Sequence, residues 1–258
     1  MNTEAVSDVS RENGRGRTDP AEPRRILAMI PILTYHRIGR LTVEHVPTVA
    51  AEAFEAHLQW LRRGGYQVIG FEELLRRLRD PRPSFRRTAM ITFDDGYEET
   101  CTIAAPLLRT YGFCATVFVA PEELGRPGFM SWEQVLALSR DGVEIGSHTM
   151  RHTFLPSVSV ERARYELIES KRVLEERLQR PVRWLSYPIG GYTPQIQAVA
   201  REAGYAAACT TNRGISKHVV DLFAIRRIKV VDQDRSPIRL WAKLSGWYDA
   251  FRRLEPPG

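Results

Sequence analysis

Short apolar runs of strand length alternate with segments of helical pattern along most of this 258-residue chain. Ser131 and Ser159 can cap two of the helices between these runs, which extend to about residues 140 and 179. The alternation repeats about seven times and predicts an α/β fold, in which helices cover a mainly parallel sheet as a barrel or an open doubly wound sheet. Strands are expected at 26–36, 66–69, 89–95, 115–120, 143–148, 183–188, 205–209 and 224–230.

The two ends of the chain differ in composition from the segment between them. Residues 1–25 have hardly any large apolar side chains, so they cannot bury enough surface to offset the entropy of ordering and are expected to form a disordered tail. Residues 26–235 are expected to form one domain. Residues 236–258 are expected to form an amphipathic helix, with Trp241 and Trp247, that packs on this domain; peripheral binding to a membrane is the alternative for that helix.

No apolar run approaches the roughly 20 residues that a membrane-spanning helix needs, and the N-terminus lacks the long apolar stretch of a signal peptide. The three cysteines show no metal-type spacing and fit a reducing compartment. A cytoplasmic protein is therefore expected.

Arginine supplies most of the positive charge behind the net charge of +6, and the densest basic stretch covers residues 76–87. Such a stretch could meet an anionic glycan, a lipid phosphate or a nucleic acid, but it is more commonly a solvated helix end with its loop. No recognition helix, zinc-finger spacing or RNA-binding motif accompanies it, so a nucleic-acid partner is not expected.

Two adjacent carboxylates, Asp94 and Asp95, end the apolar strand at 89–95 and precede a glycine that lets the chain turn. Two like charges this close repel each other unless a cation, an arginine or a shared proton relieves them. The pair therefore points to a functional site, and the alternative is an ordinary turn after a strand.

Other polar side chains occupy the same position as this pair, at the carboxyl ends of expected strands. They are His36, His148 and the Tyr187–Pro188 turn. In a parallel barrel these strand ends meet on one face, and that face carries the active site.

His148 and His152 are four residues apart, so one helical turn could bring both imidazoles to one cation. Together with Asp95 they offer two nitrogens and one oxygen, and catalytic zinc commonly has three protein ligands and a water. Asp94 could then take a proton from that water as a general base. The predicted reaction is metal-assisted hydrolysis of an acyl or amide bond; the alternative is that the two histidines meet by chance.

The segment Thr92-Phe93-Asp94-Asp95-Gly96, followed by His148-Thr149-Met150-Arg151-His152, resembles the first two motifs of the polysaccharide deacetylase family. The resemblance extends roughly over residues 26–230. It implies a distorted (β/α) barrel, a divalent metal (zinc first, with cobalt or nickel as alternatives) and the removal of N-linked acetyl groups from an amino sugar or glycan. By this likeness Asp94 is the base, and Asp95, His148 and His152 hold the metal.

The third motif of the family departs from its usual pattern here. It usually carries an arginine near a proline-aromatic-glycine turn, and this chain has Ser186 at that position. Arg227, beside a strand-like run, is the candidate that would orient Asp94 instead. The alternative is a surface arginine on an edge strand.

The late Leu-x-Leu-His motif, which supplies the general acid in the family, is missing near the C-terminus, but Leu33-Thr34-Tyr35-His36 looks like it. This order resembles the circularly permuted deacetylases of biofilm poly-N-acetylglucosamine systems and assigns His36 as the acid that protonates the leaving amine. Those enzymes are exported, whereas this chain shows no export signal. A cytoplasmic sugar, a lipid-linked intermediate or an oligosaccharide is therefore favoured over an exported polymer.

Four further residues are expected to bind the substrate. Tyr187 and Pro188 would shape the pocket wall, and the backbone N–H of Tyr97 could stabilise an oxyanion. Trp132 could stack on a sugar ring, although a core position on the helix that follows it is slightly favoured.

The leading interpretation is a metal-dependent carbohydrate N-deacetylase, a hydrolase of non-peptide carbon–nitrogen bonds. One alternative is a catalytically silent module of the same fold that binds a glycan or a lipid carrier; Ser186 favours it mildly, whereas the two intact motifs argue against it. The other alternative is an esterase or amidase that acts on a different acyl group. The sequence leaves the sugar, the identity of the metal and the oligomeric state open.

Overall fold

The computed structural model describes residues 30–39, 46–80, 83–211, 221–235 and 239–240. The expected tail at 1–25 lies outside the described residues, and so do Trp241, Trp247 and all of the expected C-terminal helix except residues 239–240. The division of the chain into a domain and two ends therefore stays a prediction.

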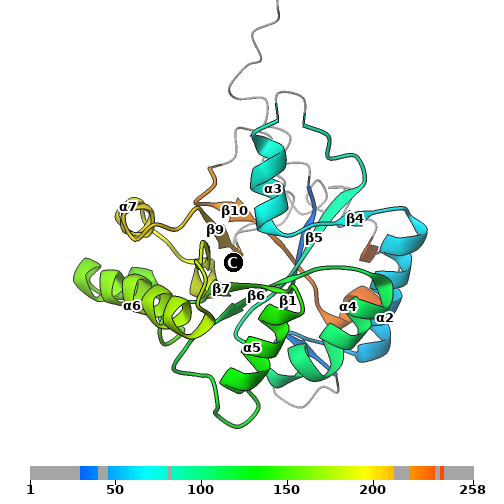
Figure 1. Ribbon diagram of the computed structural model, residues 1–258, viewed down its shortest axis with the longest axis horizontal. Coiled ribbons are helices and arrows are strands. Elements are labelled where there is room, and N and C mark those ends of the chain that lie inside the picture. The colour runs from blue at the N-terminus through cyan, green and yellow to red at the C-terminus, as the bar shows by residue number, and fades with distance from the viewer. Residues whose placement is uncertain (1–29, 40–45, 81–82, 212–220, 236–238, 241–258) are drawn as a thin grey trace, which may run out of the picture.

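The main sheet of the described residues has nine strands, and all of its ladders are parallel. Its order is β10-β9-β8-β7-β6-β5-β1-β11, and β4 pairs with the start of β5. The sheet curls into a nearly closed barrel surrounded by helices, which confirms the predicted fold class (Figure 1). The strands are β1 (Ile32–Tyr35), β4 (Gln67–Val68), β5 (Thr88–Phe93), β6 (Thr116–Val119), β7 (Glu144–Ser147), β8 (Trp184–Ser186), β9 (Ala207–Thr210), β10 (Ile225–Arg226) and β11 (Ile228–Lys229).

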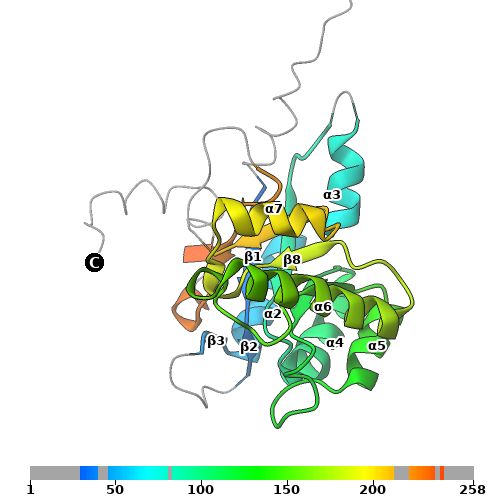
Figure 2. The same ribbon diagram turned by 90° about the vertical axis from the view of Figure 1, so that its left-hand side faces the viewer.

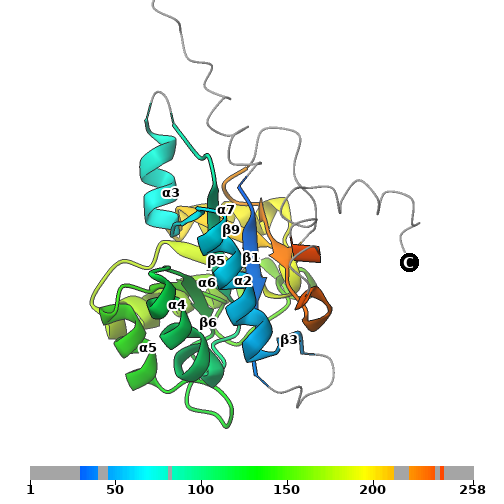
Figure 3. The same cartoon turned by 90° about the vertical axis from the view of Figure 1, so that its right-hand side faces the viewer.

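A single stretch of chain closes the barrel by dividing between the two edges of the sheet. β10 pairs with β9 at one edge, and β11 pairs with β1 at the other. Only Arg227 separates β10 from β11, so the main chain crosses the seam of the barrel at this residue. Figure 3 shows the orange stretch with β10 and β11 next to the blue β1.

Helices follow most of the strands and cover the outside of the barrel (Figures 1 and 2). The capping predictions are confirmed, because the Ser131 and Ser159 hydroxyls accept hydrogen bonds from the third residue of each helix. The helices are α2 (Ala51–Arg63), α3 (Phe71–Leu78), α4 (Ala105–Tyr111), α5 (Trp132–Arg140), α6 (Val160–Leu178) and α7 (Pro194–Glu202). Shorter elements are the strand pair β2 (Arg37–Ile38) and β3 (Thr48–Val49), the π-helical turn η1 (Thr100–Ala104), and the 3₁₀ turns η2 (Leu155–Ser157), η3 (Pro188–Gly190) and η4 (Asp232–Arg235).

The helical segment after β5 is divided into two parts near Pro106. A π-helical turn at Thr100–Ala104 runs directly into α4, and Pro106 lies in the first turn of α4. Proline lacks the N–H that continues a helical hydrogen-bond ladder, and the change from π-helical to α-helical pairing lies directly before it.

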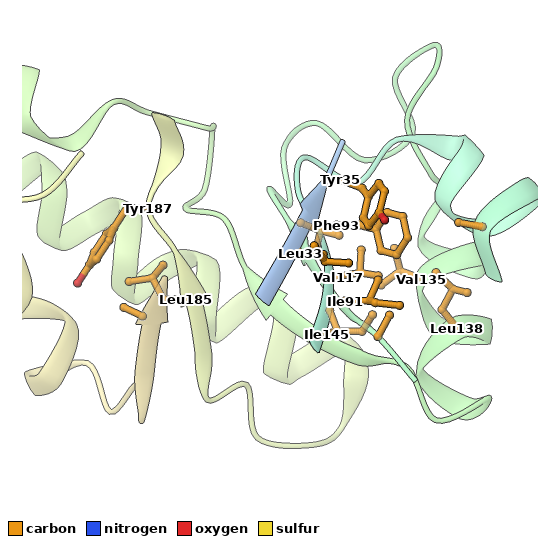
Figure 4. Packing of buried hydrophobic residues seen from close by; sticks show 14 of the residues in the cluster. Leu33, Tyr35, Ile91, Phe93, Val117, Val135, Leu138, Ile145, Leu185 and Tyr187 are labelled. Atoms are coloured by element: carbon orange, nitrogen blue, oxygen red, sulfur yellow. The ribbon is translucent and has the colours of Figure 1, made fainter. Parts of the chain in front are cut away.

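The strands β1, β5, β6, β8 and β9 are buried on both faces, as expected for a parallel sheet that helices cover. Successive strand residues point to opposite faces, and they divide accordingly between two apolar clusters. The larger cluster joins strand residues such as Leu33, Ile91 and Val117 to residues of the helices, among them Val135 and Leu138 of α5 (Figure 4).

The smaller cluster contains the alternate residues of the same strands together with α3. The Phe71 ring of α3 stacks on Trp184 with centroids 5.4 Å apart and meets the edge of Phe118 at 6.0 Å. The Arg227 guanidinium lies 5.4 Å from the Phe118 ring centroid, so a polar layer follows this apolar layer toward the carboxyl ends of the strands. The fold therefore places the polar residues of the barrel at the face where the sequence predicts the site.

None of the helices in the described ranges combines the length and the apolar character needed to cross a lipid bilayer. The expected cellular compartment stays a prediction.

Candidate active site

Asp95, His148 and His152 form a cluster in which one ligand atom of each lies within 4.8 Å of the others. The Asp95 Oδ1 atom is 3.3 Å from Nε2 of His148 and 3.2 Å from Nε2 of His152. This oxygen is buried and makes no hydrogen bond of good geometry among the described residues, although two imidazole nitrogens face it. A buried oxygen left without a proper donor beside two converging nitrogens is the arrangement that a divalent cation satisfies.

The backbone at Asp95 explains how two adjacent carboxylates can reach one site. The Asp94 N–H still extends the ladder of β5 by donating to the Tyr35 carbonyl at 3.0 Å, but Asp95 adopts φ +71° and ends the strand. Gly96 follows with φ +83°, and a Cβ there would lie 3.1 Å from a Val119 methyl group. The left-handed backbone at Asp95 therefore turns the second carboxylate away from the alternating pattern of a strand.

His148 is held both by its backbone and by its ring. Its N–H donates to the Val119 carbonyl at 2.8 Å, and its Nδ1 lies 2.7 Å from the Ser186 carbonyl oxygen. Because a carbonyl oxygen can only accept, Nδ1 carries the proton and Nε2 keeps its lone pair. The ring is thus fixed in the tautomer that can bind a metal through Nε2.

The turn between the two histidines differs from the expected helical turn. Thr149 and His152 adopt φ +64° and +54°, and residues 149–151 form a tight turn. The expectation of a helical turn was wrong because the chain leaves β7 by reversing its direction directly after the strand. The two imidazoles still come together, with ring centroids 4.8 Å apart.

Asp94 is buried and lies in a two-pronged ion pair with Arg227. Nη1 of Arg227 donates to Oδ1 at 2.8 Å, and Nη2 donates to Oδ2 at 2.7 Å. Nη2 also donates to the Ser186 hydroxyl at 2.8 Å, and Nη1 to Thr92 Oγ1 at 3.2 Å. Of the two alternatives for Arg227, the inward position is the one observed.

The charge of Asp94 depends on this partner. Burial raises the pKa of Asp94, but the charge of Arg227 and its two hydrogen bonds to the carboxylate outweigh burial and hold the pKa below its ordinary value. Burial likewise raises the pKa of Asp95, but the imidazoles of His148 and His152 beside it outweigh burial and hold this pKa well below its ordinary value. Both carboxyl groups are therefore ionised at neutral pH.

His36 directly follows β1 and lies beside both carboxylates. Burial lowers the pKa of His36, and the charges of Asp94 and Asp95 oppose this shift without cancelling it. Its Nδ1 atom is buried and has no hydrogen-bond partner among the described residues. The structure thus brings His36, Asp94, Asp95, His148 and His152 to one face of the barrel.

Tyr97 forms part of an open cleft of about 210 Å³ next to the metal-ligand cluster. Its ring stacks on Phe129 with centroids 4.9 Å apart, and Arg37 lies over the Tyr97 ring at 5.0 Å. Burial, followed by the charge of Asp95, raises the pKa of Tyr97 to about 12, so its hydroxyl keeps its proton. The cleft is lined by Asp95, Tyr97, Glu123, Phe129, Arg151 and His152.

The side chains of Tyr187 and Pro188 are buried and do not line this cleft. The Tyr187 ring belongs to the larger apolar cluster and stacks on Tyr192 with centroids 5.2 Å apart. The strand alternation points this ring outward, whereas Ser186 faces the barrel interior. The Tyr187 ring therefore does not face this cleft, and the expected role of Tyr187 and Pro188 in shaping the pocket wall stays a prediction.

Trp132 is also not brought to the cleft. It is the first residue of α5, it is half-buried against the apolar cluster, and the Arg177 guanidinium of α6 lies 5.3 Å from its ring centroid. This position agrees with the packing alternative. Phe129, which the sequence reasoning missed, is the aromatic residue that the Gly125–Gly128 loop presents to the cleft, and its position directly after Gly128 was the available signal.

Comparison with known proteins identifies relatives that share most of the length of this chain. Residues 82–208 match the family described as polysaccharide deacetylase. A Bacillus subtilis protein, YxkH, that is described as a polysaccharide deacetylase is 32% identical over 204 residues, which cover 79% of this chain and 72% of the relative. The poly-β-1,6-N-acetyl-D-glucosamine N-deacetylase of Escherichia coli is 28% identical over 118 residues, which cover 40% of this chain and 18% of that enzyme. Among solved structures, the Streptococcus pyogenes deacetylase PplD in complex with acetate gives a TM-score of 0.77 at 27% identity and covers 83% of this chain and 97% of that chain.

Proposed function

The chain belongs to the polysaccharide deacetylase family, and from this premise we propose that it is a metal-dependent hydrolase that removes N-acetyl groups from an amino sugar or N-acetylated glycan. One observation carries the proposal. A cluster of two imidazoles and one carboxylate lies beside a second carboxylate, Asp94, that a buried arginine keeps ionised.

The cluster fits a divalent metal ion by the chemistry of its donors. Asp95 would offer Oδ1, and His148 and His152 would each offer Nε2, a set of two nitrogens and one oxygen that suits zinc and also cobalt or nickel. When bound, such an ion supplies Lewis acidity, which polarises an acetyl carbonyl and lowers the pKa of water toward about 7.

Asp94 is proposed to act as the general base that takes a proton from the attacking water. Each of its two oxygens accepts one hydrogen bond from Arg227, and a carboxylate has about four lone-pair sites, so it can accept a further proton or hydrogen bond. Arg227 would thus act as a positioning residue that keeps this carboxylate ionised and oriented. Ser186, smaller than the arginine usual at its position, bonds to the same guanidinium.

His36 is proposed to protonate the departing amine, and the Tyr97 N–H to stabilise the oxyanion of the tetrahedral state. Burial lowers the pKa of His36, and the charges of Asp94 and Asp95 offset part of this shift. The stacked rings of Tyr97 and Phe129 offer an apolar wall on which a sugar ring could lie. The proposed substrate is an N-acetylated sugar chain that reaches the cleft from solvent.

Metal content tests the proposal most directly. We expect purified protein to hold about one divalent ion per chain, measured by inductively coupled plasma mass spectrometry after incubation with zinc and removal of the excess. The double variant His148→Ala/His152→Ala should lose this ion because it removes both nitrogen ligands. An equal metal content in the two proteins, or none in either, would contradict the metal-dependent mechanism.

Replacement of His36 by alanine should reduce kcat and leave the metal in place. Loss of a general acid costs about 10²-fold or more, because the amine must then leave without a positioned proton donor. Acetate release from N-acetylglucosamine oligomers gives the rate, and the metal measurement above is repeated on the variant. If His36→Ala protein loses its metal instead, His36 is a ligand and the proposed role is wrong.

A further inference from the structure

Glu166 on α6 has a carboxylate that is fully buried behind the turn between the two histidines. One of its oxygens, Oε2, accepts hydrogen bonds from two consecutive backbone N–H groups, those of Met150 at 2.9 Å and Arg151 at 3.0 Å. The other oxygen, Oε1, accepts from Arg162 one helical turn earlier at 2.7 Å. Both oxygens of this buried carboxylate are therefore in use, and two of the three donors belong to the turn.

The turn itself has an unfavourable backbone. Thr149 is β-branched and fully buried, yet it adopts φ +64°, and His152 adopts φ +54°. Such conformations persist only where the surroundings impose them. Within the turn, the Ser147 hydroxyl accepts from the Thr149 N–H at 3.2 Å, and the Thr149 hydroxyl accepts from the Thr153 N–H at 3.1 Å.

Helix α6 reaches the turn at a second point as well. The Ser170 hydroxyl, one helical turn after Glu166, lies 2.8 Å from the Ser147 hydroxyl. The helix thus contacts the last residue of β7 through Ser170 and the middle of the turn through Glu166. Because α6 packs along the flank of the barrel (Figure 2), these contacts tie the turn to a long rigid element.

We propose that Glu166 is a positioning residue of the metal site, which fixes the separation of His148 and His152 without touching a ligand atom. His148 is already anchored by its strand and by Ser186, whereas the place of His152 depends on the intervening turn. This inference rests on the proposed function, because it concerns the same metal site. It assigns a role to a carboxylate that takes no part in the proposed chemistry.

The chain contains a matched control on the same helix. Glu175 also accepts from a backbone N–H, that of Val182 at 2.9 Å, and pairs with a basic residue one turn earlier, Lys171, at 2.6 Å. It differs from Glu166 in that it supports the loop after α6 and not the histidine turn. Glu166→Asp and Glu175→Asp therefore make the same chemical change at two places, of which one alone supports the site.

The test measures zinc affinity by competition with a chromogenic chelator, the visible spectrum of the cobalt-loaded protein, and the thermal stability of the metal-free protein. Glu166→Asp should withdraw the acceptor oxygen from the turn, weaken zinc binding by about 10-fold to 100-fold, and change the cobalt spectrum. Glu166→Gln keeps one acceptor oxygen and should lose less affinity. Glu175→Asp should lower thermal stability but leave zinc affinity and the cobalt spectrum as in the wild type.

Each outcome decides the inference. Equal zinc affinity in the wild type, Glu166→Asp and Glu166→Gln would overturn the role of Glu166 and leave the proposed function standing. A wild-type protein that binds no zinc or cobalt would overturn the proposed function and this inference with it. The Asp and Gln variants retain the length or the charge of the side chain, so the test does not depend on whether Glu166→Ala folds.

Discussion

Replacement of Asp94 by asparagine is expected to abolish nearly all turnover while the protein keeps its metal. An amide cannot take the proton of the attacking water, and loss of a general base typically costs about 10²-fold to 10⁴-fold in rate. The metal should remain because the three proposed ligands, Asp95, His148 and His152, are unchanged. Acetate release from N-acetylglucosamine oligomers and the metal content of the same sample give the two measurements.

Asp95→Asn is the matched control, because it makes the same change in the adjacent residue. This variant should lose both metal and turnover, since it weakens the one oxygen ligand of the cluster. The two variants together separate the base from the ligand. Full activity of Asp94→Asn would remove Asp94 from the mechanism, and loss of metal in that variant would make Asp94 a ligand.

Replacement of Arg227 by methionine should destabilise the protein strongly and change how its stability depends on pH. The exchange leaves the Asp94 carboxylate buried without its partner, and breaking a buried ion pair in this way costs about 3–5 kcal/mol. Without Arg227, burial becomes the dominant influence and raises the pKa of Asp94 above its ordinary value. Urea unfolding of the metal-free protein measures the free energy of unfolding across the acid range.

The sign of the pH effect differs between the two proteins. In the wild type the pKa of Asp94 is lowered, so its contribution to stability is present above the ordinary carboxyl range and is lost as the pH falls through the lowered value. In Arg227→Met the raised pKa makes the ionised form costly, so the destabilisation is largest near pH 7 and shrinks as the pH falls toward about 4. Arg226→Met, at the exposed neighbouring position, should destabilise the protein much less, because solvent screens the charge of an exposed side chain. A constant difference at every pH would mean that Arg227 acts through packing alone.

Much of the fold follows from the sequence. A buried strand is visible in the sequence as a run of apolar residues, because a parallel sheet is covered on both faces. The capping residues Ser131 and Ser159 mark where α5 and α6 begin. The division of the last strand at Arg227 could not be predicted in this way. This division depends on how far the sheet curls before its two edges meet. No local sequence pattern indicates that curvature.

The sequence predicts those site residues that stand in an unusual pattern. Residues that stand in a common pattern cannot be recognised in this way. Adjacent carboxylates and paired histidines are rare enough to point to a cation. Glu166, in contrast, stands in a helix four residues after an arginine, and this is also the pattern of a solvated surface pair. The sequence predicts Tyr187 in the pocket wall because it follows a strand end. A shift of one residue along a strand moves a side chain to the opposite face of the sheet, and the Tyr187 ring lies on the outer face, against Tyr192.

The seam of the barrel links the completion of folding to the proposed chemistry. Asp94 and Arg227 are 133 residues apart in sequence, and contacts between distant segments form after local ones because a long loop must first close. The stretch that carries Arg227 also closes the barrel, because its β10 pairs with β9 and its β11 pairs with β1. The proposed base therefore acquires its charged partner only when the stretch that closes the barrel is in place.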